Sequence, residues 1–220
     1  MADLDALWPL AALRVTCGDL ELRFLDDARL AALATLATDG IHAPDAPLPF
    51  NTRWTAGTPT EVVRRVLTYH WGVRTKVAPE SWTIELGLLR DGEILGVQGA
   101  SAHDFVVNRS AETGSWLGRR YQGQGLGTRM RLMMLHLLFE GFDATQALTA
   151  AYADNPRSQG VTRRIGYVPN GVDRVAREGE SVESRRFVLT RAAWDERPDE
   201  HRLDVTLTGV AGARELLGMP

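Results

Sequence analysis

The residues with the clearest chemical meaning form one glycine-rich run, Tyr121-Gln122-Gly123-Gln124-Gly125-Leu126-Gly127-Thr128. The run follows a strand-like stretch, residues 114–118, and precedes a long apolar stretch typical of a helix. A glycine-rich turn at a helix start points several free backbone N–H groups, and the positive end of the helix dipole, at one place. Such a place suits a phosphate, which glycines allow to approach the backbone closely. We predict a phosphate-bearing ligand here, with a purely structural turn as the alternative.

Spacing excludes two common phosphate-binding motifs. The dinucleotide fingerprint needs a third glycine three residues after the second, where this chain has Thr128 or Met130. The nucleotide-triphosphate loop needs Gly-Lys-Ser/Thr, and Lys76 is the only lysine in the sequence. What remains is the pattern Gln122-x-x-Gly125-x-Gly127.

Length and composition predict one sizeable globular domain. The chain has 220 residues, of which 44% are hydrophobic, and a net charge of −3. No apolar run approaches the roughly 20 residues that a membrane-spanning helix needs. The acidic start, Met1-Ala2-Asp3, lacks the basic residues of a signal peptide. We therefore expect a cytoplasmic protein with no membrane partner and no direct nucleic-acid partner.

The sequence offers little support for a metal site or for a catalytic thiol. Cys17 is the only cysteine, and the five histidines are scattered, so we expect no disulfide and no metal site. Cys17 stands in a turn-like stretch and is interpreted as a bystander thiol rather than a nucleophile. Arginines gather between residues 157 and 191, either as a solvated face or as a basic lip for an anionic cofactor or acyl group.

Sequence patterns predict a mixture of strands and helices. The expected strands are 20–24, 82–89, 93–100, 111–118, 147–152, 167–176 and 183–190, and the expected helices are 27–38, 60–71, 127–140 and 156–165. Asp91-Gly92 marks a hairpin turn between two of the strands. This order indicates an α/β (α+β) fold with a mixed, mostly antiparallel sheet flanked by helices. We expect residues 1–190 to form the domain and residues 191–220, with a strand near 203–207, to be a C-terminal extension packed on it.

A second motif points to a family. Asn155, Ser158 and Gly166-Tyr167 follow the pattern Asn-x-x-Ser/Ala, then Gly-Phe/Tyr. Together with the glycine run, about thirty residues earlier, this resembles the paired motifs of the GNAT acyltransferases. Gly114-Ser115-Trp116-Leu117 resembles a strand of the RimJ/RimL-like branch, which acetylates the N-termini of ribosomal proteins. The resemblance covers about residues 13–190.

The resemblance implies a fold and a cosubstrate. Strands 114–118 and 146–152 would splay apart, and the pantetheine of acetyl-CoA or succinyl-CoA would fill the gap. The implied cofactor-binding residues are Trp116, Leu117, Gln122, Gly123, Gln124, Gly125, Leu126, Gly127, Thr128, Asn155 and Ser158.

The resemblance also implies direct attack of a primary amine on the acyl thioester in a ternary complex. Many members use a tyrosine as the acid for the thiolate, at a position that here is Thr162. The RimL-like branch resembles a scheme in which the motif serine, here Ser158, stabilises the thiolate; capping the helix is the alternative role. For the base, the resemblance suggests Glu178, one residue out of register, and Asp104 is a second candidate.

Two classes of function stay open. The first is a CoA-dependent N-acyltransferase, and the second is a non-catalytic acyl-CoA-binding or sensing module. Deprotonating a lysine side chain at pH 7 costs about 4.6 kcal/mol, against roughly 1–1.4 for an α-amine, so a site without an obvious base favours the α-amine or a small amine over lysine. The loop 40–58, with Phe50 and Trp54, would either cover the acceptor or plug the core. A homodimer is possible by analogy with the family.

Overall fold

The structure, a computed structural model, describes residues 4–220, so the acidic start at Met1–Asp3 lies outside the described residues. The helices are α1 (Leu4–Leu7), α2 (Asp27–Thr38), α3 (Pro59–Arg74), α4 (Phe105–Asn108), α5 (Leu126–His136), α6 (Pro156–Ile165), α7 (Arg191–Asp195) and α8 (Val210–Leu216). The strands are β1 (Arg14–Cys17), β2 (Leu20–Phe24), β3 (Ser81–Arg90), β4 (Glu93–His103), β5 (Ser110–Leu117), β6 (Gln146–Tyr152), β7 (Val168–Arg177), β8 (Glu180–Thr190) and β9 (Thr206–Thr208).

The strands form one sheet in the order β7-β8-β6-β5-β4-β3-β2-β1-β9. Every neighbouring pair is antiparallel except β5 and β6, which are parallel. This confirms the expected mixed, mostly antiparallel sheet flanked by helices. Asp91 and Gly92 both have positive φ angles, 50° and 79°, as expected of a two-residue hairpin turn.

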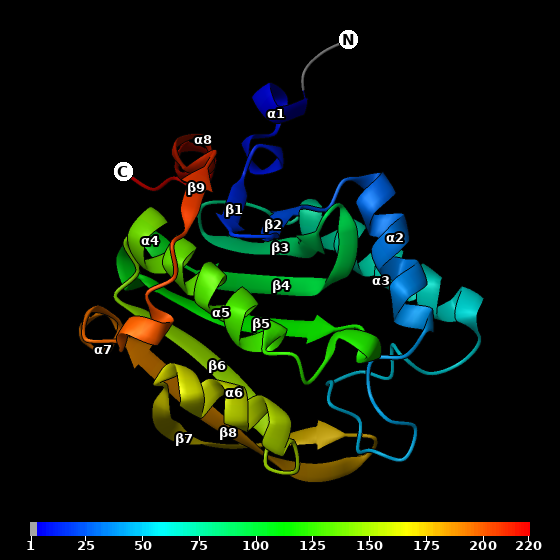
Figure 1. The fold of residues 1–220 in the computed structure, drawn as a ribbon. Helices are drawn as coiled ribbons and strands as arrows, with labels where there is room; N and C mark the ends of the chain where they lie inside the picture. The colour runs from blue at the N-terminus through cyan, green and yellow to red at the C-terminus, as the bar shows by residue number, and fades with distance from the viewer. Residues whose placement is uncertain (1–3) are drawn as a thin grey trace.

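The parallel pair splits the sheet. β5 and β6 are in register only from Ser110↔Gln146 to Glu112↔Leu148, after which the backbone ladder ends. Figure 1 shows the two strands fanning apart toward the glycine-rich loop. The splay predicted for strands 114–118 and 146–152 is therefore present.

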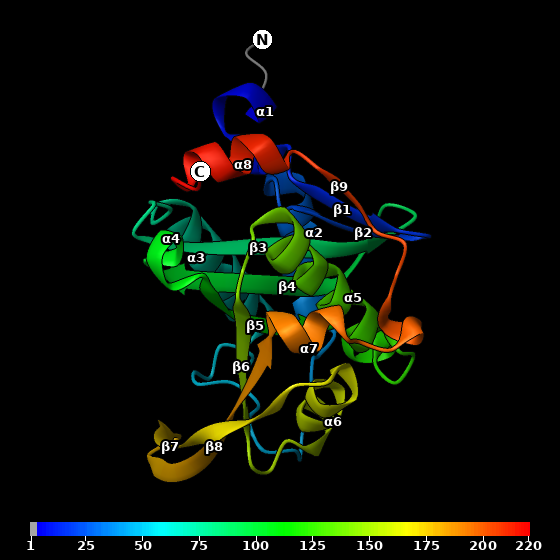
Figure 2. The same cartoon turned by 90° about the vertical axis from the view of Figure 1, so that its left-hand side faces the viewer.

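The helices cover the two faces of the sheet (Figures 1 and 2). α5 lies over the central strands, and its apolar residues belong to the larger core cluster together with those of β1 to β6. α2 and α3 pack on the opposite face, where Leu33, Val66 and Val97 belong to a second cluster. Asp26 caps α2 through a 2.8 Å bond from the Arg29 amide, and Thr58 and Glu61 form a capping box at α3.

Some boundaries differ from the sequence predictions. The helix expected over 127–140 is α5 followed by a π-helical turn, Leu137–Gly141, which keeps the apolar run buried. Cys17 ends β1 and is buried, and the turn lies after it, at Gly18. The last strand is β9, three residues C-terminal to the expected start at 203, because Thr206–Thr208 are the residues that pair with β1.

Residues 191–220 cross back over the sheet to its far edge. Trp194 in α7 stacks on Phe139, with ring centroids 5.2 Å apart. Ala213 and Leu217 are fully buried in the larger core cluster. α1 and the C-terminus therefore lie on the same side of the molecule (Figure 1).

Candidate active site

The glycine-rich run forms an open anion cradle at the start of α5. Gly123 and Gly125 have φ angles of 75° and 77°, which glycine adopts without strain. The amide of Gln122 donates to Arg119 and that of Thr128 to Gly125. In the described part of the chain, the five amides between them, residues 123–127, donate to no protein acceptor. Five free N–H groups at a helix start are the arrangement that suits a pyrophosphate.

The side chains of the two glutamines in this run hold the loop rather than face a ligand. Gln122 Nε2 donates to the carbonyl oxygens of Ile41 (2.6 Å) and Leu117 (3.0 Å). Gln124 Nε2 donates to the Arg120 carbonyl oxygen at 2.9 Å. Gln122 thereby ties the end of β5 to the loop 40–58.

Beyond the loop, the backbone of β5 faces the gap. The Gly118 amide donates to Leu95 of β4 at 2.9 Å. Since successive amides of a strand point to opposite edges, the Ser115 and Leu117 amides face the gap between β5 and β6. A chain lying in the gap can therefore pair with β5 as an extra strand would. The Trp116 side chain packs toward α2, while Leu117 is buried on the α5 side.

The second motif starts α6 beside the gap. Asn155 is the N-cap, because its Oδ1 accepts the Ser158 amide at 3.1 Å. Ser158 is therefore the third helical residue, and its hydroxyl is not the cap. Thr162, which stands where many members of the resembled family have a tyrosine, is fully buried, and its hydroxyl has no partner among the described residues.

Polar side chains line the α5 side of the gap. The Thr113 hydroxyl donates to the Leu148 carbonyl at 3.2 Å, and the Thr149 hydroxyl donates to the Thr113 carbonyl at 2.9 Å. Arg131 of α5 reaches both strands through Ser115 Oγ and Thr149 Oγ1, each at 3.3 Å. The splayed strands are thus bridged by side chains where their backbones no longer pair.

The opposite face of the sheet carries a carboxylate beside two glycines. Glu85 of β3 is in register with Gly99 of β4, which is in register with Gly114 of β5. A Cβ added at Gly99 would lie 2.8 Å from the Glu85 carboxylate, whereas one added at Gly114 would meet nothing within 4 Å. The Glu85 carboxylate therefore lies over Gly99, one strand from an open position on the edge of the gap.

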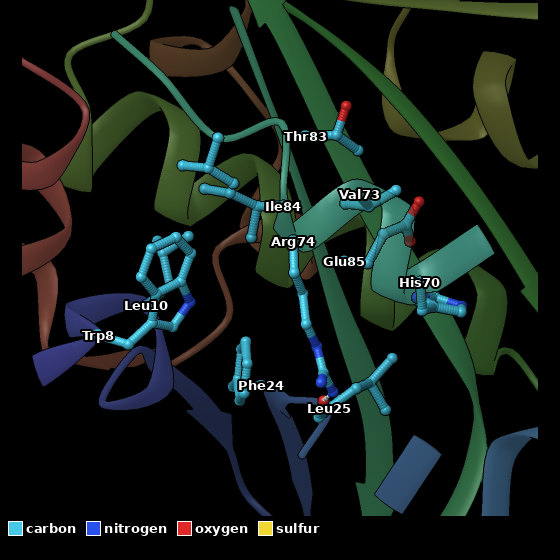
Figure 3. Close-up of a pocket in the computed structure, with 11 residues that line it drawn as sticks. Trp8, Leu10, Phe24, Leu25, His70, Val73, Arg74, Thr83, Ile84 and Glu85 are labelled. Atoms are coloured by element: carbon cyan, nitrogen blue, oxygen red, sulfur yellow. Dashed lines mark hydrogen bonds between the residues drawn. The ribbon is translucent and has the colours of Figure 1, made fainter. Parts of the chain in front are cut away.

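Glu85 also has an unusual chemical environment. Its Oε1 accepts a 2.9 Å hydrogen bond from Tyr69 Oη of α3. Figure 3 shows Glu85 beside His70 and Val73, along a small cavity of about 20 Å³. Burial raises the pKa of Glu85 to about 7, and the Tyr69 hydrogen bond opposes that shift. A carboxyl group with a pKa near neutrality can act as a proton acceptor at physiological pH.

The loop 40–58 closes the same face. Phe50, Trp54 and Trp116 form a chain of ring contacts, with centroid distances of 4.9 and 5.6 Å. Asn51 Oδ1 accepts a 2.6 Å hydrogen bond from Tyr152 Oη at the end of β6. The loop therefore joins β5 to β6 across the open end of the gap.

The structure separates the two acids considered for the base. Glu178 stands in the β7–β8 turn, with a φ of 54°, and its Oε1 lies 3.2 Å from Arg53 Nε of the loop 40–58. The neighbouring Arg177 pairs with Asp154, next to the motif asparagine, so Glu178 and the start of α6 lie at the same end of the sheet. Asp104 follows β4 at the end where β5 begins, about 25 Å of strand from the glycine-rich run. The structure does not bring Asp104 together with Ser158.

Three residues of this region were not predicted from the sequence: Arg131, Glu85 and Glu112. Arg131 was hidden within an apolar helix, where one arginine carries no signal of its own. Glu85 is one residue of an expected strand, 82–89, and no motif singles it out. Glu112 is exposed on the same face as Gly114, two residues before it, and no motif singles it out either. The positions of all three depend on which strands neighbour each other, and a single sequence does not show this.

Comparisons with known proteins agree with this geometry. A family model described as "Acetyltransferase (GNAT) domain" matches residues 19–168. A solved structure titled as RimL, a ribosomal L7/L12 alpha-N-protein acetyltransferase in complex with coenzyme A, superposes with a TM-score of 0.65 at 19% identity, covering 80% of this chain and 96% of that one.

Two curated relatives match shorter segments. A Bacillus subtilis (strain 168) protein named "Putative ribosomal N-acetyltransferase YdaF" is 34% identical over 118 residues, which is 51% of this chain and 62% of the relative. The "Ribosomal-protein-serine acetyltransferase" of Escherichia coli (strain K12) is 26% identical over 84 residues, 38% of this chain and 46% of the relative. The matches therefore span less than two thirds of each relative. Among residues 4–220, no helix is long and apolar enough to cross a membrane.

Proposed function

Because this chain belongs to the GNAT acetyltransferase family, we propose that it transfers an acetyl group from acetyl-CoA to a primary amine. The observation that carries this proposal is the cradle of five free amides, residues 123–127, opening onto the gap between β5 and β6. A pyrophosphate on the amides would leave the pantetheine along β5. The Ser115 and Leu117 amides would then bind the pantetheine or the thioester oxygen.

The acceptor amine would approach from the opposite face, over Gly114. That position is open, and the Glu85 carboxylate lies one strand away. We propose Glu85 as the base, since its pKa of about 7 lies within roughly one unit of an α-amine at 7.7–8.0. The equilibrium for proton transfer from the ammonium to Glu85 is then unfavourable by a factor of only about ten. For an ordinary glutamate, with a pKa near 4.3, it would be unfavourable by several thousandfold.

Two candidates from the sequence receive different roles in this proposal. Ser158 would donate to the departing thiolate, because Asn155 supplies the helix cap and leaves the serine hydroxyl available. Glu178 would hold the loop 40–58 through Arg53 rather than accept the proton. Asp104 has no part in this scheme.

The acceptor class follows from the same pKa comparison. A lysine near 10.4 lies more than three units above Glu85, so the α-amine of a protein or peptide suits this base better. The names of the curated relatives, which refer to ribosomal proteins, favour a protein N-terminus as the acceptor and a cytoplasmic location. Succinyl-CoA stays a second cosubstrate to be tested beside acetyl-CoA.

An acylation assay would test the function. Release of CoA thiol from acetyl-CoA would be followed with a peptide that has a free N-terminus, and with a matched N-acetylated peptide that has a free lysine. We expect turnover of the first and at least tenfold slower turnover of the second. Binding of acetyl-CoA without turnover of either peptide or of small amines would instead support the acyl-CoA-sensing module.

A further inference from the structure

Arg131 has an environment that packing alone does not explain. Its side chain is 5% exposed, and it is the only buried arginine, lysine, aspartate or glutamate among the described residues. Arginine keeps its proton in proteins, so the buried group is a cation. Burying a charge is unfavourable unless the group is paired and hydrogen-bonded.

The protein leaves this cation incompletely satisfied. No carboxylate in residues 4–220 forms an ion pair with Arg131. Its hydrogen bonds to Ser115 Oγ and Thr149 Oγ1 are both long at 3.3 Å, and the Tyr167 hydroxyl is a further neutral partner. Its Nε is buried without a partner. A buried cation with only neutral partners is well placed to bind a negative charge that a ligand brings.

The position of the guanidinium identifies that charge. Ser115 lies three residues beyond the last β5 residue that pairs with β6, and Thr149 one residue beyond its last partner on β6. The guanidinium therefore spans the narrow end of the gap, on its α5 side. A pantetheine that runs from the glycine-rich run along β5 would bring its thioester end to this place. Tyr167 Oη, 3.3 Å from Thr113 Oγ1, completes the polar lining.

We propose that Arg131 is a catalytic residue that contacts the thioester and stabilises the negative charge formed during acyl transfer. This inference rests on the proposed function. The ammonium of the acceptor first gives one proton to Glu85. The neutral nitrogen then attacks the carbonyl carbon, and the π electrons of the carbonyl move to its oxygen. When they return, the C–S bond breaks, the electron pair leaves on sulfur, and the second proton of the nitrogen passes to sulfur by way of Ser158. Arg131 keeps its own proton and faces the charge on oxygen and then on sulfur.

The test compares Arg131→Met with the wild type and with Arg129→Met. Arg129 lies on the same helix but pairs with Asp19 at the protein surface, so it controls for the substitution itself. Two readouts are taken: kcat/KM with acetyl-CoA and a peptide amine, and the ionisation of the thiol of bound free CoA. Thiolate absorbance across pH reports the second readout, with the absorbance of the CoA-free protein subtracted to remove Cys17.

We expect Arg131→Met to fold, because a hydrophobic side chain of similar volume often replaces a buried charge without loss of stability. It should lower kcat/KM by about 10²- to 10³-fold, as loss of one oxyanion donor does. In the wild type, the bound CoA thiol should have a lower pKa than the same thiol of CoA free in solution, and the variant should return the pKa to that free value. Arg129→Met should match the wild type in both readouts. If the methionine variant does not fold, Arg131→Gln, which keeps a hydrogen-bonding side chain but not the charge, carries the same expectations.

The proposal would be overturned if Arg131→Met had the wild-type kcat/KM and ionised the thiol of bound CoA at the same pH as the wild type. A loss confined to succinyl-CoA would also overturn it, since the arginine would then bind an acyl carboxylate. Failure of the wild type to bind any CoA species would instead refute the proposed function, and the inference with it.

Discussion

The hydroxyl of Tyr69 donates a 2.9 Å hydrogen bond to the carboxylate of Glu85, joining α3 to β3 on the face that we assign to the acceptor. Tyr69 stabilises the ionised form of Glu85, while burial favours the protonated form and is the larger effect. The same pairing and burial raise the pKa of Tyr69 above its ordinary value, so the tyrosine stays protonated and remains the donor. The pair thus holds a carboxyl group that titrates near neutral pH beside the open Gly114 position.

Replacing Glu85 by Gln should remove the base. We expect kcat/KM for a peptide amine to fall about 100-fold, the lower end of the range for general-base catalysis, while the Kd for acetyl-CoA changes little. The wild-type kcat/KM should decline as pH falls through about 7, where Glu85 becomes protonated, and the variant should lack this limb. Other charged or titratable groups on this face are His70 and Arg74 of α3, Arg23 of β2 and Glu112 of β5. Glu215→Gln, at an exposed position of α8, is the matched control, and a wild-type profile in Glu85→Gln would refute this role.

Replacing Tyr69 by Phe should move the same limb. Since the Tyr69 hydrogen bond lowers the pKa of Glu85, its loss should shift the acid limb of kcat/KM to higher pH. A role of Tyr69 in packing alone would change stability and leave the limb in place. The measurement is the pH dependence of kcat/KM for the variant and the wild type, and a shift to lower pH would contradict the assignment.

The sequence predicted most of this fold, because its signals were local. The Asp91-Gly92 turn, the Asp26 cap and the proline after Asn155 each specify their own element. The glycine-rich run and the Asn155-x-x-Ser158 motif were enough to suggest the family. Element limits were less accurate where tertiary pairing decides, as with β9, which starts only where its residues meet β1.

The candidate site was predicted only in part. The amides at 123–127 belong to one contiguous run and could be read directly. Glu85 lies against Gly99, and Arg131 binds Thr149. Each of these contacts joins residues that are distant in sequence. The alternative role of Ser158 as a helix cap was wrong, because the asparagine three residues earlier takes it. In β-rich folds, such roles depend on strand order, which local patterns do not specify.

Replacing Glu178 by Gln should affect the loop 40–58 rather than the chemistry. Arg53 and Glu178 are 70% and 41% exposed, and exposed pairs contribute at most about 1 kcal/mol, equivalent to about fivefold. We therefore expect a change below fivefold in KM for the peptide and no new pH dependence of kcat. A 100-fold loss of kcat, with the wild-type KM, would make Glu178 the base.

Trp194 should be essential to stability. It is 1% exposed, stacks on Phe139, and donates from Nε1 to Glu140 at 2.6 Å. Trp194→Ala should lower the free energy of unfolding by about 3–5 kcal/mol in a denaturant titration. Trp71→Ala, at a half-exposed position on α3, should cost much less. A cost below 1 kcal/mol for Trp194→Ala would contradict this stabilising role of Trp194.

Calorimetric titration of acetyl-CoA into the wild type, Gly125→Glu and Gly92→Glu tests the central claim most directly. Both glycines have φ angles near 78° and open space around a new Cβ, so the two variants share the backbone strain and the added charge. Only Gly125 lies in the amide cradle. We predict that the wild type and Gly92→Glu bind acetyl-CoA alike and that Gly125→Glu shows no binding. Equal binding by all three proteins, or no binding by the wild type, would contradict the assignment of this loop to the CoA pyrophosphate.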